Sequence, residues 1–283
     1  MRQTLRGVDR DGLERSCNDA IRLGAAGHGI ERAEVRLSTW AFEPHRHDTY
    51  AIGITIAGVQ IFRYRGARRI CLPGQLHVLH PDETHDGAAG TPDGLAYRIL
   101  YIAPEVVRAA LHDAPLPFVA DPVAPGPTAR RLAALLLDVD DPIDGLRGAE
   151  IAATVADALR ALGGRRQARP ARLDLRAVER VRDYLSEHAS ERTPAATLEA
   201  IAGVDRFTIA RHFRWAYGTS PDRYRTLRRL ELARTAIQAG VPLARAAADA
   251  GFADQSHLTR QFARAYGFPP GRWAALVARA GPS

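Results

Sequence analysis

The sequence predicts an α+β protein of two domains: an N-terminal antiparallel β-barrel with flanking helices, and a C-terminal domain built only of helices. Three observations support this fold class. Short runs of alternating apolar and polar residues fill positions 34–103. From residue 104 onward, apolar residues recur every three or four positions, as they do on amphipathic helices. Finally, a twenty-residue segment occurs twice, at 202–221 and at 251–270.

The chain as a whole has 283 residues, which is enough for two domains of ordinary size, each with its own core. No apolar run approaches the eighteen or so residues that a membrane helix needs, and the first thirty residues show no targeting signal. We therefore expect a cytoplasmic protein with no membrane partner. Cys17 and Cys71 are too few for a disulfide framework and are expected to be buried thiols.

The net charge of +7 is carried by arginine alone, because the sequence contains no lysine. Residues 1–172 hold 22 arginines and 21 acidic residues, whereas residues 173–283 hold 17 arginines and 11 acidic residues. The C-terminal part thus carries nearly all of the excess positive charge. A basic domain beside a near-neutral one indicates that the C-terminal part meets a polyanion.

The expected strands of the barrel are short and are separated by turn residues. They are EVRLSTW at 34–40, YAIGITIAG at 50–58, VQIFRYRG at 59–66, LHVLH at 76–80 and YRILYIA at 97–103. Helices are predicted over 104–113, 127–139 and 146–164, and the last two carry apolar stripes. The stripe residues are Leu132, Leu135, Leu136 and Val139, and Ile151, Val155, Ala158, Leu159 and Leu162. These stripes pack either on the barrel or on the same helices of a second subunit, which would make a homodimer.

The segment GGRRQARPAR, residues 163–172, combines glycine, proline and charge with no apolar periodicity. It is predicted to be a linker. The linker divides an N-terminal domain, residues 1–162, from a helical domain, residues 173–283.

The second copy of the repeat has the signals of one helix. Asp254 is suited to cap its first turn, and Gly267 to end it, because glycine adopts the left-handed conformation without steric cost. Leu258, Phe262 and Ala265 share one apolar face. The residues of the opposite face are Gln255, Ser256, Thr259 and Arg260.

The first copy repeats these signals with Asp205 and Gly218, and seven of the twenty aligned positions are identical. Its outward residues are Arg206, Phe207, Ala210, Arg211 and Arg214. A short helix and a turn precede each copy, so each unit is predicted to be a helix-turn-helix whose second helix enters the major groove of DNA. Solenoid repeats are the alternative, but solenoids need three or more repeats.

Residues 221–238 connect the two units and contain neither glycine nor proline in their interior. This predicts one rigid helix of about 27 Å. Two recognition helices on one face of B-DNA must lie about 34 Å apart, and a rigid connector of this length suits that spacing.

The segments AGVDRFTIARHFRWAYGTSPDRY and GFADQSHLTRQFARAYGFPPGRW closely resemble the DNA-binding domain of the AraC/XylS family of transcription regulators, over residues 175–277. The resemblance implies two helix-turn-helix units bridged by one long helix, with base contacts from Phe207, Ala210, Arg211 and the outward residues of the second unit. Arg211 and Arg260 would either bond guanine or clamp phosphate, which the sequence leaves open.

The N-terminal stretch that contains PHRHD, LPG and PDETH, within residues 40–103, resembles the cupin-like effector domain of the same family. His45 and His47 point to one face of a strand, and His85 could join them to hold a metal. Cupin enzymes add a glutamate shortly after the second histidine, but this chain has Ala51, Ile52 and Gly53 there. We therefore expect no cofactor and no catalysis; a metalloenzyme with a helical DNA-binding tail is the alternative.

The predicted function is transcription regulation by sequence-specific binding of double-stranded DNA under control of a small-molecule effector in the barrel. RNA polymerase would be a further partner if the protein is an activator. The residues expected to line the effector pocket are His45, His47, Tyr50, Arg63, Tyr64 and His85.

Overall fold

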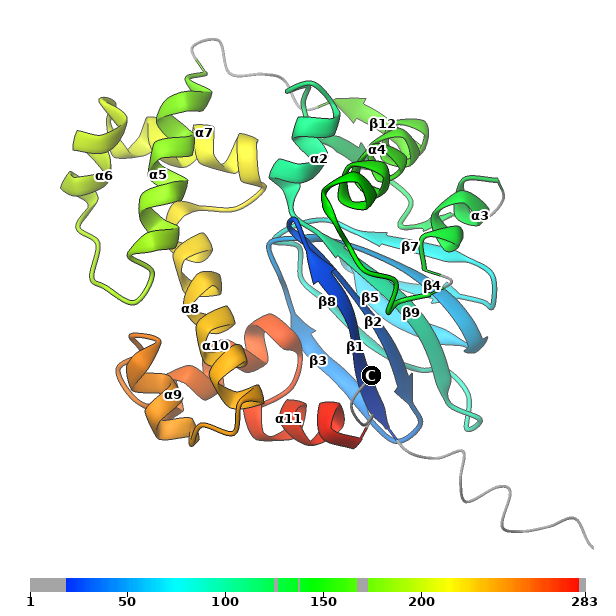
Figure 1. Ribbon diagram of the computed structural model, residues 1–283. Coiled ribbons are helices and arrows are strands. Elements are labelled where there is room, and N and C mark those ends of the chain that lie inside the picture. The colour runs from blue at the N-terminus through cyan, green and yellow to red at the C-terminus, as the bar shows by residue number, and fades with distance from the viewer. Residues whose placement is uncertain (1–18, 125–126, 137, 167–172, 280–283) are drawn as a thin grey trace, which may run out of the picture.

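The computed structural model describes residues 19–124, 127–136, 138–166 and 173–279. Figure 1 shows a sheet-rich N-terminal part on one side and a helical C-terminal part on the other. Within the described residues, no helix is both long enough and apolar enough to cross a membrane. Cys71 is a buried free thiol, as predicted, and Cys17 lies outside the described residues.

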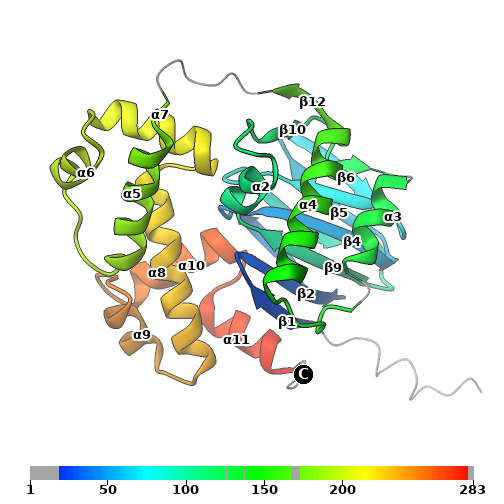
Figure 2. The same cartoon turned by 45° about the horizontal axis from the view of Figure 1, so that its top comes forward.

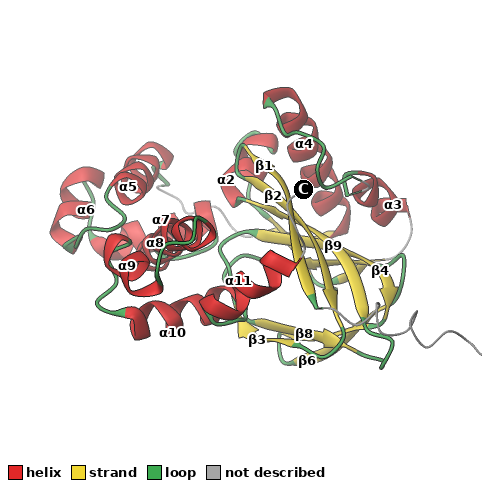
Figure 3. Ribbon diagram, turned by 60° about the horizontal axis from the view of Figure 1, so that its bottom comes forward, coloured by secondary structure: helices red, strands yellow, loops and turns green. Residues whose placement is uncertain are grey.

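The N-terminal part contains two antiparallel sheets that face each other as the two halves of a barrel (Figure 3). The larger sheet has the order β1-β2-β9-β4-β7-β11 and the smaller one the order β3-β8-β5-β6. The larger sheet consists of β1 Ala20–Gly27, β2 Ile30–Leu37, β4 Tyr50–Gly58, β7 Leu76–Leu79, β9 Leu95–Ile102 and β11 Val123–Ala124. The smaller one consists of β3 Ala41–His45, β5 Gln60–Tyr64, β6 Ala67–Cys71 and β8 His85–Ala89.

The five predicted strands correspond to β2, β4, β5, β7 and β9, whereas β1, β3, β6, β8 and β11 were not predicted. The missed strands lack a clear alternation of bulky apolar residues: β1 reads AIRLGAAG and β6 reads ARRIC. β3 contains Pro44, which has no N–H to donate, and such a residue is tolerated because β3 is an edge strand.

Among the described residues, three helices flank the sheets: α2 Pro104–Ala110, α3 Pro127–Ala134 and α4 Gly145–Leu162. α4 begins where Asp144 accepts a hydrogen bond from the backbone N–H of Arg147. The apolar stripes predicted for 127–139 and 146–164 are buried in one core with Ile52, Val78 and Leu100 of the larger sheet. The stripes therefore pack on the barrel of their own chain, over the outer face of the larger sheet (Figure 2).

The predicted linker begins with a strand. Gly163–Arg166 forms β12, which pairs antiparallel with β10, Pro117–Val119. Backbone pairing needs no apolar periodicity, so the composition of GGRRQARPAR could not reveal it. These four residues continue the N-terminal fold rather than the linker, and residues 167–172 lie outside the described part of the chain.

The C-terminal part is helical throughout, as predicted. Its helices are α5 Leu175–Glu187, α6 Ala195–Ala202, α7 Arg206–Tyr217, α8 Pro221–Gln238, α9 Leu243–Asp249, α10 Gln255–Tyr266 and α11 Pro270–Arg279. The predicted caps are present: Asp205 accepts from the N–H groups of Phe207 and Thr208, and Asp254 accepts from that of His257. Both repeats end at a left-handed glycine, with φ of 71° at Gly218 and 76° at Gly267.

The connector is the single helix α8, with the predicted bounds. The core of the first helix-turn-helix unit, α6 and α7, is closed by α5 and the start of α8. The sequence predicted two domains, each with its own core, and the second unit, α9 and α10, departs from this division. Its buried residues belong to one continuous core with α8, α11 and the barrel interior, in which Phe268 packs on Phe42 with ring centroids 4.6 Å apart.

Candidate functional site

The outward face of α7 is open to solvent. Phe207 keeps 74% of its surface exposed, an unusual position for a large apolar side chain. Arg206 is bonded to Glu199 of α6, with its Nε 2.9 Å from Oε1, and Arg211 donates to the hydroxyl of Thr208 at 3.1 Å. All five residues predicted to read DNA from this helix are exposed: Arg206, Phe207, Ala210, Arg211 and Arg214.

The outward face of α10 is also accessible. Gln255, Ser256 and Arg260 are exposed, and Thr259 is half-buried. The side chain of His257 turns back onto Phe252, with ring centroids 5.4 Å apart and the rings at 90°. The two helices therefore both present polar and positive side chains to solvent, as the sequence predicted.

The second helix-turn-helix unit and α8 dock on the barrel. The backbone N–H groups of Glu43 and Arg46 donate to the carbonyls of Gly267 and Arg264 at the end of α10, each at 3.0 Å. Arg223 of α8 donates to the carbonyl of Arg46 at 2.6 Å. α11 lies along β1 (Figure 3). The helical part thus closes the side of the barrel where the edge strands β1 and β3 lie.

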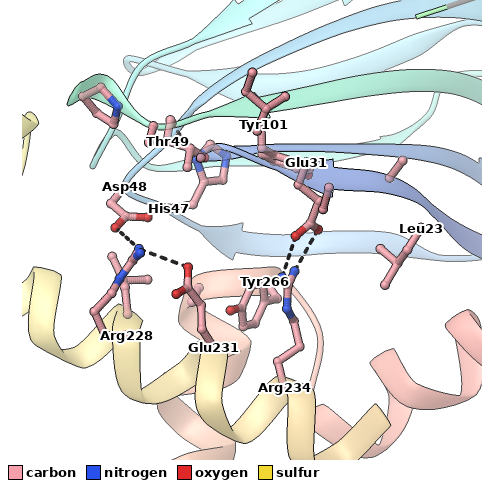
Figure 4. Close-up of a pocket in the computed structure, with 18 of the residues that line it drawn as sticks. Leu23, Glu31, His47, Asp48, Thr49, Tyr101, Arg228, Glu231, Arg234 and Tyr266 are labelled. Carbon is pink, nitrogen blue, oxygen red and sulfur yellow. Dashed lines mark hydrogen bonds and ion pairs between the residues drawn. The ribbon is translucent and has the colours of Figure 1, made fainter. Parts of the chain in front are cut away.

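A cavity of about 270 Å³ lies between the two parts. This volume is near the lower end of the range for small-molecule sites, about 300 Å³. Its apolar walls come from β1, β2, α8, α10 and α11 and include Ile21, Leu23, Val35, Leu227, Ala265 and Trp273. Figure 4 shows Asp48, Arg228 and Glu231 toward one end of the cavity and Leu23 toward the other, so its two ends differ in polarity.

Two ion pairs join α8 to the barrel beside this cavity (Figure 4). Arg234 donates to both carboxylate oxygens of Glu31 on β2, at 2.8 and 2.5 Å. Arg228 donates to Asp48 at 2.7 Å and lies 3.1 Å from Glu231. Burial raises the pKa of Glu231 to about 7, although Arg228 opposes the shift.

Three histidines meet where the cavity adjoins the barrel interior. His45 and His85 are directly paired residues of β3 and β8, and their ring centroids are 4.3 Å apart. The ring of His47 lies 4.9 Å from that of His85. Burial, followed by repulsion from the neighbouring imidazoles, lowers the pKa of His45 and His47 well below the usual value, and burial lowers that of His85. All three rings are therefore neutral at physiological pH.

Backbone carbonyls fix the tautomers of these rings. The Nδ1 atoms of His45, His47 and His85 lie 2.8, 2.9 and 2.9 Å from the carbonyl oxygens of Glu43, Thr49 and Glu83. A carbonyl only accepts, so each Nδ1 carries the proton and each Nε2 presents a lone pair. The Nε2 of His47 is buried and has no partner in the described part of the chain.

In the described part of the chain these rings are not arranged as a metal site. No group of three or more His, Cys, Asp or Glu side chains in the described ranges is arranged to hold a metal ion. The donor set consists of three neutral imidazoles without the carboxylate that the cupin pattern adds. The possible metal site at His45, His47 and His85 is therefore a prediction that the structure does not support.

The six residues predicted to line the effector pocket do not form one group. His45 and His47 line the cavity, and His85 lies beside them. Tyr50 instead points to the core under α4, where its hydroxyl bonds the carbonyl of Pro117 at 3.3 Å. Tyr64 bonds His80, and Arg63 is exposed. The barrel interior next to the histidines has a cavity of only about 30 Å³, room for one water molecule.

The sequence did not identify the charged and aromatic residues that α8 and α10 contribute to the cavity: Tyr224, Arg228, Glu231, Arg234 and Tyr266. The alternation of apolar and charged residues along 221–238 was the available signal for a functional helix face, but charged residues on a helix face are usually solvated. Only the docking of the two parts turns this face into a cavity wall.

Comparisons with known proteins agree with this architecture. Residues 27–178 match the AraC-like ligand binding domain, and residues 198–275 match a helix-turn-helix domain. YbfI of Bacillus subtilis (strain 168), an uncharacterized HTH-type transcriptional regulator, is 25% identical over 223 residues, which are 77% of this chain and 81% of YbfI.

Among solved structures, ToxT from Vibrio cholerae has the same fold, with a TM-score of 0.62 at 9% identity over 88% of this chain and 99% of ToxT. A structure of ToxT bound to an unsaturated fatty acid gives a TM-score of 0.61 at 10% identity, covering 94% of this chain and 96% of ToxT. The resemblance and the two-domain α+β fold predicted from the sequence are thus confirmed, and the metalloenzyme alternative is set aside. The match to the AraC-like ligand binding domain covers more than half of the chain. The chain therefore belongs to the AraC family, whose members are transcription regulators and not enzymes.

Proposed function

We propose that this AraC-type regulator binds a specific operator through α7 and α10, and that a small-molecule effector in the cavity between the barrel and α8 controls this binding. The base-reading residues would be Phe207, Ala210 and Arg211 in the first unit and Gln255, Ser256, Thr259 and Arg260 in the second, with Arg206 and Arg214 beside them. All of these side chains are exposed except that of Thr259, which is half-buried, and they lie on the two helices of the predicted repeat, which supports this assignment.

One observation supports the effector site above all others: side chains that line the cavity also fix α8. Arg228 and Arg234 lie on the connector between the two recognition helices, and their partners Asp48 and Glu31 lie on the barrel. A ligand among these four side chains must change the contacts that hold α8. ToxT, which shares the fold, has been solved with a bound unsaturated fatty acid, so the fold accommodates a ligand.

The mechanism is a population shift between arrangements of the helical part relative to the barrel. The effector binds one arrangement better and thereby increases its population, with a coupling free energy of about 1–3 kcal/mol for a typical regulator. Arrangements that place α7 and α10 on consecutive turns of the major groove bind the operator. The effector site and the DNA are thus linked through the position of α8.

The domain assignment is part of the proposal. Residues 1–162 together with β12 form the effector-binding and dimerisation domain, the linker follows, and residues 173–283 form the DNA-binding domain. The regulator acts in the cytoplasm as a homodimer. The stripes of α3 and α4 are buried within the chain, so a dimer would use other surfaces. RNA polymerase is a partner if the protein activates.

Selection of DNA fragments by the purified full-length protein tests this function. Sequencing of the retained fragments should recover one motif, which binds roughly a thousandfold or more tighter than random DNA at fixed salt. Fragments without a common motif would contradict sequence-specific binding.

The recovered motif then tests the effector site. Leu23→Trp fills the apolar end of the cavity and should change the affinity for the motif at least threefold, as measured by fluorescence anisotropy. Leu146→Trp is the matched control, because Leu146 is 83% exposed on α4 and does not line the cavity. Equal behaviour of the two variants would argue against control through this cavity.

A further inference from the structure

We propose that the effector is an organic ammonium ion, an apolar body carrying one protonated amine, and that the acidic end of the interdomain cavity binds its charge. This inference rests on the proposed function, because it takes the cavity as the effector site. Three features support it: a surplus of carboxylates, hydrogen-bond acceptors without a donor, and aromatic walls beside them.

Acidic side chains outnumber basic ones in the cavity wall. The six charged residues that line it are Glu31, Asp48, Glu105, Arg228, Glu231 and Arg234. The two arginines are already paired with Glu31 and Asp48. Glu231 shares Arg228 with Asp48, and Glu105 forms no ion pair with any residue that the structure describes. Two carboxylates are therefore left over, and a cation would balance one of them.

The surplus carboxyls are poorly stabilised by the protein groups around them. Burial raises the pKa of Glu105 and raises that of Glu231 to about 7. Burial is the largest cause of both shifts, and Asp48 adds to both, whereas Arg228 opposes them. An ammonium ion beside Glu231 would remove this penalty, because an opposite charge at short range favours the ionised carboxylate.

Two uncharged side chains of the wall, those of His45 and His47, offer acceptors as well. His45 and His47 use their Nδ1–H groups on backbone carbonyls, so their Nε2 atoms can only accept. The Nε2 of His47 has no partner among the described residues, and Figure 4 shows His47 at the same end of the cavity as Asp48. An ammonium group has three donors and no acceptor, and it therefore complements such a wall.

The aromatic and apolar residues indicate an organic cation rather than a bare metal ion. Tyr101 and Tyr266 lie between the acidic end and Leu23, and Phe42 and Trp273 also line the cavity. Aromatic faces attract ammonium groups, and the apolar end would take the body of the molecule. The cavity of 270 Å³ equals about nine water molecules in volume, which matches a small arylalkylamine.

An anionic ligand fits this wall less well. The Nε–H donors of Arg228 and Arg234 are buried without a partner in the described part of the chain, and a carboxylate could accept from them. It would, however, be a fifth acid in a wall with two arginines, and both arginines already bind carboxylates. The balance of charge favours the cation.

Titration calorimetry of the full-length protein at pH 7.5, in buffer with EDTA, tests the inference. The probes are 2-phenylethylamine, 2-phenylethanol and phenylacetate, which share the aromatic ring and differ in the charge of the head group. We expect the amine to bind at least about tenfold more tightly than the alcohol, as one charge-assisted hydrogen bond allows, and phenylacetate to bind most weakly. Equal binding of amine and alcohol, or tighter binding of phenylacetate, would overturn the inference.

Two variants separate a specific role from a structural one. Glu231→Gln keeps the shape of the side chain, so it should weaken the amine about tenfold and leave the alcohol within about twofold. The same substitution at Glu187, which is exposed on α5 outside the cavity, should change neither affinity. An equal loss for both probes in Glu231→Gln would mean that Glu231 only maintains the structure.

The outcomes also separate this inference from the proposed function. One set of results would refute only the ammonium inference: the alcohol binds, Leu23→Trp abolishes this binding, and the amine binds no more tightly than the alcohol. The cavity would then still be a ligand site. No binding of the amine at millimolar concentration, or binding that requires added Zn²⁺ in place of EDTA, overturns the inference. If Leu23→Trp also leaves operator affinity unchanged, the effector site of the proposed function fails too.

Discussion

Arg234 of α8 and Glu31 of β2 form a two-bonded ion pair across the boundary between the helical part and the barrel, with N···O distances of 2.8 and 2.5 Å. Both side chains are about one fifth exposed, so water screens the pair only partly. The planar guanidinium holds both carboxylate oxygens, which restricts the rotation of α8 as well as its distance from the sheet. This pair is therefore a specific contact between sensor and DNA-binding domain.

Removal of this ion pair should loosen the docking of the two parts. We expect Glu31→Gln to lower the free energy of unfolding by about 1–3 kcal/mol, because Arg234 remains without its carboxylate in a half-buried position. Urea unfolding measures the effect. A double-mutant cycle with Arg234→Gln should show that the two substitutions are not additive, and additive effects would mean that the ion pair contributes nothing.

Arg260 should contribute to operator recognition. Its side chain is exposed near the middle of α10, and replacement by alanine should weaken binding of the recovered motif by about 1–3 kcal/mol if it bonds a base. An equal loss on random DNA would instead identify a phosphate contact. The control is Arg245→Ala on α9, because Arg245 is exposed but is paired with Asp249 at 2.8 Å.

The buried histidines should make the protein sensitive to acid. Both ring nitrogens of His77 are buried without a partner among the described residues, and burial lowers its pKa to about 3. The unfolded chain, with a histidine pKa near 6.5, binds the proton first, so this group's contribution to stability is present above pH 6.5 and is lost progressively as the pH falls toward 3.

His77→Leu removes this titration. Between pH 6 and 4, the free energy of unfolding of the wild type should fall more steeply than that of the variant, by up to about 1.4 kcal/mol per pH unit for one whole proton. Urea unfolding at a series of pH values measures both slopes. Parallel curves would show that His77 takes up its proton equally in the folded and unfolded states.

Glycine should be required at position 267 for two reasons: the left-handed backbone conformation, and the lack of space for a side chain. Its φ is 76°, and an added Cβ would lie 2.8 Å from Phe42 and 2.9 Å from the ring of His45. Gly203 has a similar φ of 70° but no atom within 4 Å of an added Cβ. Gly203→Ala should therefore cost about 1–2 kcal/mol, the penalty of the left-handed conformation.

Gly267→Ala should cost more than Gly203→Ala, because the methyl group also pushes against the barrel. Thermal unfolding compares the two variants. Equal losses would mean that the contact between the end of α10 and β3 yields easily, which would weaken the case for a tightly docked second unit.

Separation of the domains at the linker should leave a folded DNA-binding fragment. In residues 173–283 the core of the first helix-turn-helix unit is complete, so we expect helical circular dichroism and binding to DNA. The second unit loses its contacts with the barrel, and its amides should exchange with solvent faster than in the full chain. An unfolded or insoluble fragment would contradict the proposed boundary.

Local signals explain why the DNA-binding part could be predicted closely. Asp205, Gly218 and Pro221 act on their own turns of the chain, so the ends of α7 and the start of α8 follow from the sequence without knowledge of distant residues. The exposed residues of α7 and α10 follow equally from the helical period.

The cavity could not be predicted, because it depends on how two parts meet. Glu31 and Arg234 are 203 positions apart, and nothing in either segment indicates that the other will pair with it. Tyr50 was misplaced for a related reason: strand alternation gives two faces, but only the packing of α4 decides which one is covered. The bounds of the edge strand β3 were missed because its sequence, AFEPH, does not alternate apolar and polar residues.

The end of α10 shields an edge strand. β3 is the outer strand of the smaller sheet, and the N–H groups of Glu43 and Arg46 are satisfied by carbonyls of the helical part. If the two parts separated fully on DNA, this edge would be left open to pairing with strands of other chains, a known route to aggregation. Movements in which the helices slide or tilt against the barrel keep this edge covered. Complete separation of the two parts should therefore be rare, because it would expose the edge and promote aggregation.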